Sequence, residues 1–464
     1  MAYLANRDKK TYDVVVVGAG AAGIACVKEL VDRGYRNIAC LEATDKAGGR
    51  VRFNSKFGDV GGMSLHLPNK FLKVQNLHSE FWGASDLVKF ANKNNFSFYR
   101  ENNRPKFRLY HNGQKIKEGI VNHANSLIMN AIKSAIDKIK KKELPAEISL
   151  GEALSDLLED DICRSLITTV YSTTDTGLDV EDISFVDYTN TMPSNPGLFP
   201  IDGMGTLLSA YARPIRQYIS FNKEVLAVRN DAGLITVSGL DTKTGTSFGM
   251  NAKTLVLTVS IGVLQSWTKE EKITLAKEKI LAIDNIKMGR LNKNILLMKE
   301  KFFTENNIRT FTHINIRSNR LDQDANFLAV NLHGKYFMIN FVGGKKSLRY
   351  EKKGTAFARK DSLKILASVF GPDVYEFFID SYLSQWNTNK FFHGAYTAST
   401  KENLNARLEL SEPLDKNIYY AGEAVRYLVD EISYHTHISG ALHSGFMTAN
   451  AVIRNFRLAI SRFY

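Results

Sequence analysis

Residues 12–43 read YDVVVVGAGAAGIACVKELVDRGYRNIACLEA, and the fold of the whole chain follows from this stretch. An apolar β-branched run, Val14 to Val17, leads into a glycine turn. An amphipathic helical stretch and a second apolar strand follow the turn. This order of elements indicates a βαβ unit with two parallel strands.

The glycine turn has the spacing of a dinucleotide-binding loop. Gly18, Gly20 and Gly23 form G-x-G-x-x-G: the first permits the turn, the second lets the backbone approach a pyrophosphate, and the third lets the helix pack on the strand. The helix N-terminus supplies N–H groups and a partial positive charge for phosphates. Glu42 ends the second strand, where an acid accepts hydrogen bonds from ribose hydroxyls. A dinucleotide site is expected, although this geometry does not separate NAD from FAD.

A second glycine pair with an arginine, Gly48-Gly49-Arg50, follows the acidic residue. Here the chain resembles the flavin amine oxidase superfamily, in which this segment serves FAD and the arginine can pair with a diphosphate oxygen. The resemblance continues in the family's order through residues 58–66, 203–205, 255–264 and 420–424, with Ser260 where proline is usual. The residues assigned to FAD are Gly18, Gly20, Ala22, Gly23, Glu42, Ala43, Gly49, Arg50, Gly61, Gly62, Met63, Val225, Gly422, Glu423 and Ile438.

The resemblance also implies residues for the chemistry. Lys293 stands where the family has a lysine that holds a water near flavin N5. Trp386 and Tyr396 match the family's W…GxY spacing, in which the tyrosine forms one wall of an aromatic cage for the amine. Ala395 stands where monoamine oxidases have their flavin-linking cysteine, so the FAD is expected to be non-covalent.

The second wall of the cage is expected at His437, just before the last family helix. The loop of residues 425–436 is longer than usual in the family, which leaves His435 and Tyr434 as alternatives.

His66 is the residue that bears most on the substrate. Histidine at this point is similar to polyamine oxidases, whereas many L-amino-acid oxidases carry a carboxylate-binding arginine in the same stretch. This favours a carboxylate-free, polyamine-like amine. An L-amino-acid oxidase that uses Arg349 with Tyr350 as its carboxylate anchor is the alternative.

The resemblance implies an FAD-dependent amine oxidase. A neutral amine would give a hydride to flavin N5, O₂ would reoxidise the flavin to give H₂O₂, and the imine would hydrolyse to an aldehyde, or to a 2-oxo acid and ammonia if the substrate is an amino acid. An FAD-dependent desaturase or protoporphyrinogen-type oxidase, and a flavin-binding protein without turnover, are further alternatives.

The order of segments predicts an α/β fold with a Rossmann-type FAD-binding domain and an α+β substrate domain. The first domain is expected to comprise residues 1–78, 200–265 and 410–464. The second is expected to comprise residues 79–199 and 266–409, a mixed sheet with a helical insertion, because residues 79–187 have helical periodicity and few strand signals.

Composition narrows the class of protein and its partners. The chain has 464 residues and a net charge of +13, but its basic residues are scattered and no nucleic-acid-binding pattern is present, so no nucleic-acid partner is expected. Cys26, Cys40 and Cys163 are too widely spaced for a disulfide framework or a zinc site, so no metal is expected. The sequence has no signal peptide or membrane-spanning run, which predicts a cytoplasmic protein with a small-molecule substrate and O₂ as partners, and a homodimer is compatible with it.

Overall fold

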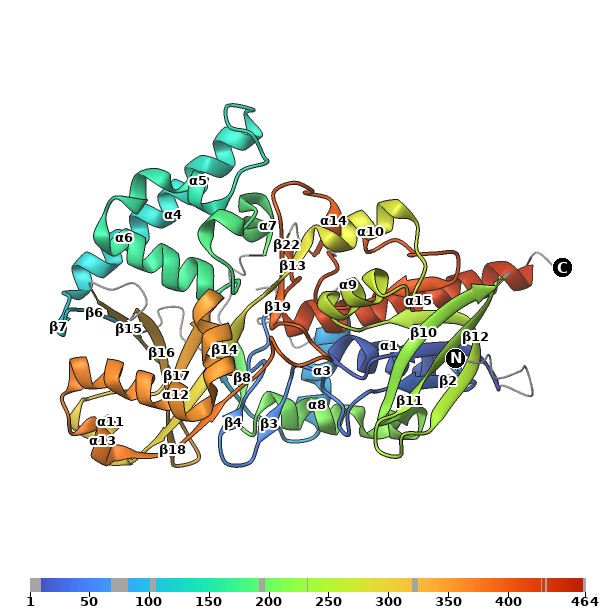
Figure 1. Ribbon diagram of the computed structural model, residues 1–464, viewed down its shortest axis with the longest axis horizontal. Coiled ribbons are helices and arrows are strands. Elements are labelled where there is room, and N and C mark those ends of the chain that lie inside the picture. Colours follow the sequence, from blue (N-terminus) through green and yellow to red (C-terminus); the bar gives the residue numbers. More distant parts are fainter. Residues whose placement is uncertain are drawn as a thin grey trace.

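The computed structural model contains two sheets at opposite ends of an elongated molecule (Figure 1). The residues that the structure describes are 10–67, 82–100, 106–191, 197–231, 233–318, 324–426, 428–429 and 432–461.

The first sheet is the nucleotide-binding sheet that the sequence predicts. Its strands in spatial order are β10 (Lys223–Asp231), β11 (Leu234–Asp241), β12 (Ser247–Leu257), β1 (Thr11–Val17), β2 (Ile38–Leu41) and β9 (Ile219–Ser220), and β20 (Ile418–Tyr420) pairs with β12. β1 is parallel to β2 and β12, and β10 and β11 add an antiparallel edge. The α/β fold class is therefore confirmed.

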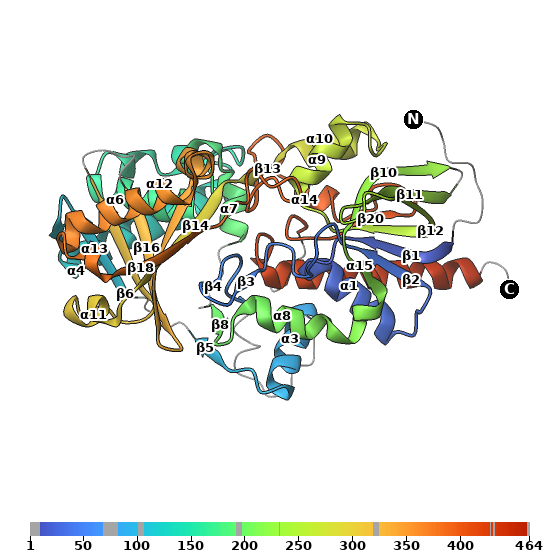
Figure 2. The same ribbon diagram turned by 60° about the horizontal axis from the view of Figure 1, so that its bottom comes forward.

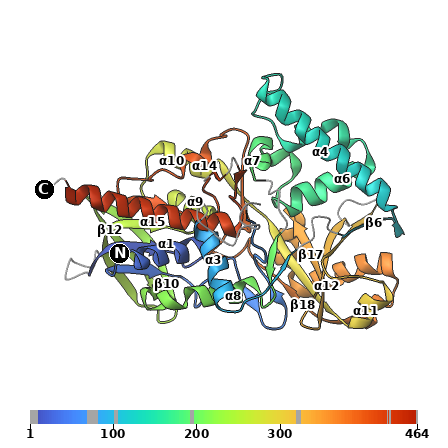
Figure 3. The same ribbon diagram turned by 180° about the vertical axis from the view of Figure 1, so that it is seen from behind.

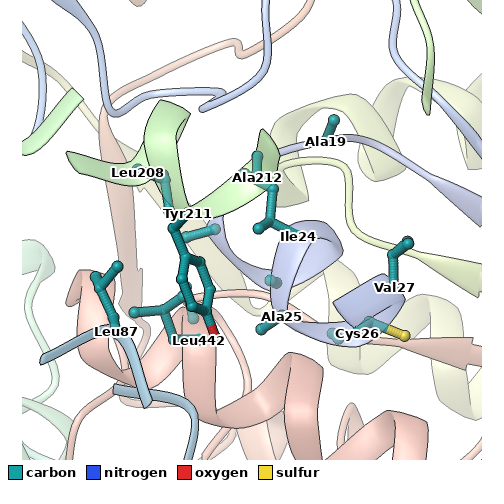
Figure 4. Close-up of a cluster of buried hydrophobic side chains, with 14 of the residues drawn as sticks. Ala19, Ile24, Ala25, Cys26, Val27, Leu87, Leu208, Tyr211, Ala212 and Leu442 are labelled. Carbon is teal, nitrogen blue, oxygen red and sulfur yellow. The ribbon is translucent and has the colours of Figure 1, made fainter. Parts of the chain in front are cut away.

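Both faces of β1 are buried, as in other parallel sheets. Val14 and Val16 face one core, and Val15 and Val17 face another. Helices α1 (Ala21–Asp32), α3 (Trp82–Lys93), α8 (Met204–Ala212) and α15 (Ile438–Ser461) contribute to the first core (Figure 4). Helices α9 (Ile261–Lys269), α10 (Lys277–Asp284) and α14 (Ala406–Glu409) contribute to the second.

The second sheet is mixed and mostly antiparallel. Its strands in spatial order are β18 (Phe378–Leu383), β14 (Leu291–Met298), β17 (Lys335–Gly343), β16 (Ala325–Leu332), β15 (Thr312–Arg317), β6 (Lys106–His111) and β7 (Gln114–Lys115). One face packs on α11 (Glu300–Glu305), α12 (Gly344–Phe370) and α13 (Val374–Phe377). Ile295 and Ile339, on the other face, pack with Phe57 and Phe199.

A group of helices, called the helical unit below, lies against this second sheet (Figures 2 and 3). It comprises α4 (Glu118–Lys140), α5 (Leu150–Ala153), η1 (Ser155–Leu158), α6 (Asp161–Leu166), the π-helix η2 (Ile167–Thr174), η3 (Val180–Asp182) and α7 (Phe185–Asn190). The helical insertion is thus present, but the expectation of few strands was incomplete. β6 and β7 form a hairpin that joins the second sheet where β6 pairs with β15, and β5 (Phe98–Arg100) pairs with β8 (Leu198–Pro200). The partners β15 and β8 are distant in the chain, so local sequence does not reveal these strands.

The remaining elements are three short pairs of strands and a 3₁₀ helix. They are the pairs β3 (Phe53–Asn54) with β4 (Gly58–Asp59), β13 (Ile286–Gly289) with β19 (Tyr396–Ser399) and β21 (Leu428–Val429) with β22 (Ile432–Ser433), and the 3₁₀ helix η4 (Arg213–Tyr218). α3 contacts α8 and α15, although the predicted boundaries assign it to the second domain. The boundaries stay a prediction. Within the described part of the chain, no helix is long and apolar enough to cross a membrane.

Close packing of α15 on α1 depends on Gly445. A Cβ atom at this buried position would lie 2.0 Å from the carbonyl oxygen of Ala22 in α1. We expect Gly445→Ala to separate the two helices and to lower the free energy of unfolding by about 1–3 kcal/mol, the usual effect of overpacking. Thermal unfolding of the purified variant would show this as a lower midpoint.

Gly119→Ala is the matched control. Gly119 lies in the first turn of α4, where an added Cβ would meet no atom within 4 Å. Its midpoint should equal or slightly exceed that of the wild type. Equal midpoints for both variants would contradict the packing argument.

Candidate functional site

A cavity of about 720 Å³ is lined by residues from both sheets, the helical unit and the start of α15. Every residue that the sequence assigns to FAD or to the chemistry lines it, with the exception of Gly23. The structure therefore brings together segments that are far apart in the sequence, such as those of Gly20 and Gly422.

The glycine turn forms one end of the cavity. Gly18 has a φ of +107°, and α1 begins directly after Gly20 without a side-chain cap, so its first N–H groups stay available to a ligand. Gly23 does not line the cavity because it packs inward: a Cβ atom there would lie 1.9 Å from the carbonyl oxygen of Gly18. This is the helix-packing function expected of the third glycine.

Glu42 is held at this end by three hydrogen bonds. Its Oε2 accepts from the backbone N–H of Ala19 at 2.8 Å, and its Oε1 accepts from the N–H and hydroxyl of Thr44 at 2.9 and 2.7 Å. The carboxylate is 6% exposed and lines the cavity together with Ala43 and Val225. Its position and orientation suit the ribose of a nucleotide.

Arg50 and Glu423 form an ion pair in the cavity wall. Arg50 Nη1 lies 2.9 Å from Glu423 Oε1 and donates to the carbonyl of Ala395 at 2.8 Å. Thr397 donates its hydroxyl to Glu423 Oε2 at 2.7 Å. Burial opposes ionisation of Glu423, but Arg50 and Arg407 hold its pKa below the usual range. The Glu423 carboxylate is therefore ionised at neutral pH.

Lys293 lies on β14 and is 6% exposed. Its Nζ donates to the carbonyls of Gly61 at 2.6 Å and Asp59 at 3.0 Å, which fixes the amine against the wall that contains Gly62 and Met63. Burial lowers the pKa of Lys293 to about 8, and the nearby Asp59 carboxylate partly opposes this shift. An ammonium group has three N–H donors, so a third remains for a water or a ligand.

Tyr396 and Trp386 also line the cavity. Tyr396 begins β19 and donates its hydroxyl to the carbonyl of Thr174, at the end of the π-helix η2. Trp386 packs edge-to-face on Phe392, with ring centroids 5.3 Å apart. Ser260, where the family usually has proline, caps α9 by accepting from the N–H of Val263.

Of the three candidates for the second wall, His437 lines the cavity. It packs edge-to-face on His66, with ring centroids 4.9 Å apart. His435 is buried against Asp187 and Ser433, and Tyr434 lies in the core beside α15. Neither His435 nor Tyr434 lines the cavity.

The sequence interpretation missed Asp175 at the end of the cavity formed by the helical unit. Asp175 directly follows η2 and lines the cavity with Tyr171, Tyr188 and His313. Tyr188 donates its hydroxyl to Asp175 Oδ2 at 2.9 Å, and burial raises the pKa of Asp175 to about 6. The helical periodicity around residues 167–174 gives no sign of the π-helical bonding that precedes Asp175 in the structure.

The expected carboxylate anchor of the amino-acid oxidase alternative is wrong. Arg349 is exposed on α12, where its guanidinium lies 5.2 Å from the ring centroid of Phe357. Tyr350 is 1% exposed and donates to Asp361. Neither residue lines the cavity. Among the described residues that do, Arg50 is the only arginine, and Glu423 already neutralises it.

Comparison with known proteins gives one consistent family. Residues 21–453 match the family described as flavin containing amine oxidoreductase. The chain is 24% identical to "Lysine-specific histone demethylase 1 homolog 2" of Oryza sativa subsp. japonica, over 95% of this chain and 57% of that protein. It is 23% identical to "Polyamine oxidase 3" of the same organism, over 97% and 92%, and 23% identical to the L-amino-acid oxidase of Vipera ammodytes ammodytes, over 97% and 95%.

Solved structures share the fold. Cyclohexylamine oxidase from Brevibacterium oxydans superimposes with a TM-score of 0.75 at 16% identity, over 96% of this chain and 99% of that one. Wild-type putrescine oxidase bound to putrescine superimposes with a TM-score of 0.74 at 16% identity over the same shares. The chain spans 57% and 60% of the length of the histone demethylase homologues of Oryza sativa and Arabidopsis thaliana.

The lowered pKa of Lys293 has a consequence for stability that does not depend on activity. Below a pH of about 8 the native protein keeps a buried ammonium at Lys293, which lowers the free energy of unfolding. Between a pH of about 8 and the ordinary pKa of 10.5, the native state loses this proton while the unfolded state keeps it. The free energy of unfolding therefore rises with pH in this range. We expect the stability of the wild type relative to Lys293→Met to rise as the pH rises from 8 to 10. Chemical denaturation of both proteins at each pH would measure it, and a constant or falling difference would contradict the shift.

Proposed function

The chain belongs to the flavin-containing amine oxidoreductase family, and we propose that it is an FAD-dependent oxidase of amines that carry no carboxylate. The observation that carries this proposal is the lining of the cavity. One end has nucleotide-binding fingerprints, and the other combines Lys293, Tyr396 and His437 with the carboxylate of Asp175. The cavity offers no unneutralised arginine, among the described residues, to bind the carboxylate of an amino acid.

FAD is the cofactor of this family, and the residues present fit it. The uncapped start of α1 suits a pyrophosphate, and Glu42 suits a ribose. The start of α15 at Ile438 adds a second helix N-terminus at the cavity. Cys26, Cys40 and Cys163 are all buried and none lines the cavity, which supports non-covalent binding.

When bound, FAD supplies the acceptor for a hydride from the amine α-carbon and passes the electrons to O₂. The protein's residues would orient the amine and exclude water. Tyr396 and His437 are the proposed walls that fix the angle of the C–H bond. Lys293, held by Asp59 and Gly61, would keep its remaining N–H for a water or flavin atom near the reacting centre.

Relatives support a carboxylate-free amine. The names "Polyamine oxidase 3", putrescine oxidase and cyclohexylamine oxidase describe proteins that act on such amines. Because an L-amino-acid oxidase is also among the relatives, L-amino acids are included among the substrates to be tested. A methylated-lysine peptide is included because of the histone demethylase homologues.

The test is anaerobic bleaching of the visible flavin spectrum. The purified protein is mixed with polyamines, alkylamines, L-amino acids and a methylated-lysine peptide. We expect amines without a carboxylate to bleach the flavin, and admission of air to restore the colour with formation of H₂O₂. Bleaching by L-amino acids alone would establish the alternative substrate. A flavin that none of these compounds bleaches would favour a desaturase or a protein without turnover.

Glu42→Ala should weaken the retention of FAD, because the carboxylate at the ribose position would be lost. We expect the purified variant to have a lower ratio of flavin to protein absorbance. Asp45→Ala is the matched control, since Asp45 is an exposed acid three residues away that does not line the cavity. Equal flavin content in both variants and the wild type would remove the ribose assignment.

A further inference from the structure

A hollow of about 260 Å³, called the basic hollow below, lies at the start of α12 and shares no residue with the main cavity. Five of the six residues that line it are basic, and the six are Arg290, Lys345, Leu348, Arg349, Lys352 and Lys353. Among the described residues, no acid lines this hollow. It therefore differs from the main cavity, whose wall contains the acids Glu42, Glu224 and Glu423.

The sequence of α12 places four of these charges on one face of the helix. Counted from Lys345, the α12 residues of the basic hollow stand at i, i+3, i+4, i+7 and i+8, the spacing of a single helix face. Glu351 lies outside this face, is 7% exposed, and accepts from the backbone N–H groups of Asn387 and Thr388 at 3.0 and 2.8 Å. The one acid of residues 344–353 is thus engaged inside the protein and does not neutralise the hollow.

Arg290 brings a fifth charge from another part of the chain. It directly follows β13, and Gly344, the first residue of α12, donates its backbone N–H to the carbonyl of Arg290 at 2.9 Å. The N–H of Arg290 donates to the carbonyl of Gly177 at 2.9 Å. These two hydrogen bonds fix the backbone of Arg290 beside the start of the helix, and its side chain lines the hollow.

The basic residues of the hollow lack counter-ions from the protein. Within the described part of the chain, none of these five cations forms an ion pair with an acid. Arg349 and Lys353 both lie over the ring of Phe357, with their cationic groups 5.2 and 4.7 Å from its centroid. Asp179 lies near the helix start, where its Oδ1 would be 3.2 Å from a Cβ atom at Gly344, but it does not line the hollow. Because like charges at i, i+4 destabilise a helix, a bound anion would relieve a repulsion that the protein itself leaves in place.

We propose that the basic hollow binds the oligophosphate group of a small ligand, either an inorganic oligophosphate or a nucleotide. The charges on α12 extend from residue 345 to residue 353, which is about 12 Å along the helix axis and suits several linked phosphates better than a single one. Arg290 and Arg349 can each donate two parallel N–H groups to phosphate oxygens, and the lysines add positive charge.

The shape of the basic hollow favours a compact ligand over a polymer. The helix that carries the charges is interrupted at Gly354, where φ is +79°, so the charged face ends one residue after Lys353. At the other end, the segment of Arg290 closes the hollow. The inference does not depend on the proposed function, because the main cavity and the basic hollow have no residue in common.

The test is isothermal titration calorimetry of the flavin-loaded protein with inorganic triphosphate and, separately, with ATP, both in magnesium-free buffer. Flavin loading keeps the phosphate-binding end of the main cavity filled. We expect the wild type to bind one triphosphate per chain. Arg349→Gln and Arg290→Gln should each weaken this binding by about 10-fold or more, because each removes charge-assisted hydrogen bonds to phosphate. Equal affinities for triphosphate and ATP would support an inorganic oligophosphate, and tighter binding of ATP would support a nucleotide.

Lys360→Gln is the matched control. Lys360 is an exposed lysine of the same helix, beyond Gly354, that does not line the hollow, so this variant loses one positive charge and should keep the affinity. Equal weakening in all three variants, or no saturable binding by the wild type, would overturn the inference. Binding of a DNA duplex or of phosphatidylserine vesicles by a protein that does not bind triphosphate would also overturn it. These outcomes leave the amine oxidase function untouched, since the bleaching experiment tests that function separately.

Discussion

A buried charge network centred on Arg50 and Glu423 joins the parts of the chain that form the cavity. Arg50 contacts Glu423, which accepts from Thr397, and Thr397 accepts from Arg407. Arg407 in turn pairs with Asp187, which contacts His435. Removing one partner from a buried ion pair typically costs about 3–5 kcal/mol. The network therefore holds three segments in fixed relative positions: the segment of Arg50, strand β19 and the segment that leads into α15.

This network also explains why His437 faces the cavity. His435 Nε2 lies 3.2 Å from Asp187 and its Nδ1 lies 2.7 Å from Ser433, so that its ring is held inside the protein. His437 is two residues further along, at the start of α15, and its Nδ1 contacts the carbonyl of His435 at 2.9 Å. His435 therefore stabilises the surrounding structure, whereas His437 lines the cavity.

The parts of the fold and site that could be predicted depend on local sequence. The valine run and the glycine spacing of residues 12–43 define β1, the turn and α1 without reference to the rest of the chain, and the family, the fold class and FAD are confirmed. The position of Asp175 in the cavity wall could not be found in this way, because this residue follows a π-helix and is held by Tyr188 of another helix. The same limit explains the error over Arg349, which is exposed because its neighbour Tyr350 packs into the core with Val342 and Leu383 from the second sheet. The assigned roles of the site residues stay predictions.

The net charge of +13 does not oppose a cationic substrate, because the location of charge matters more than its sum. Arg290, Lys345, Arg349, Lys352 and Lys353 lie around a small hollow at the start of α12, apart from the residues that line the main cavity. Exposed charges are screened over about 8–10 Å at physiological salt. Asp175 instead lines the cavity, where burial raises its pKa and where charge interactions are much stronger than at the surface. A basic surface and an acidic end of the substrate cavity are therefore compatible in one molecule.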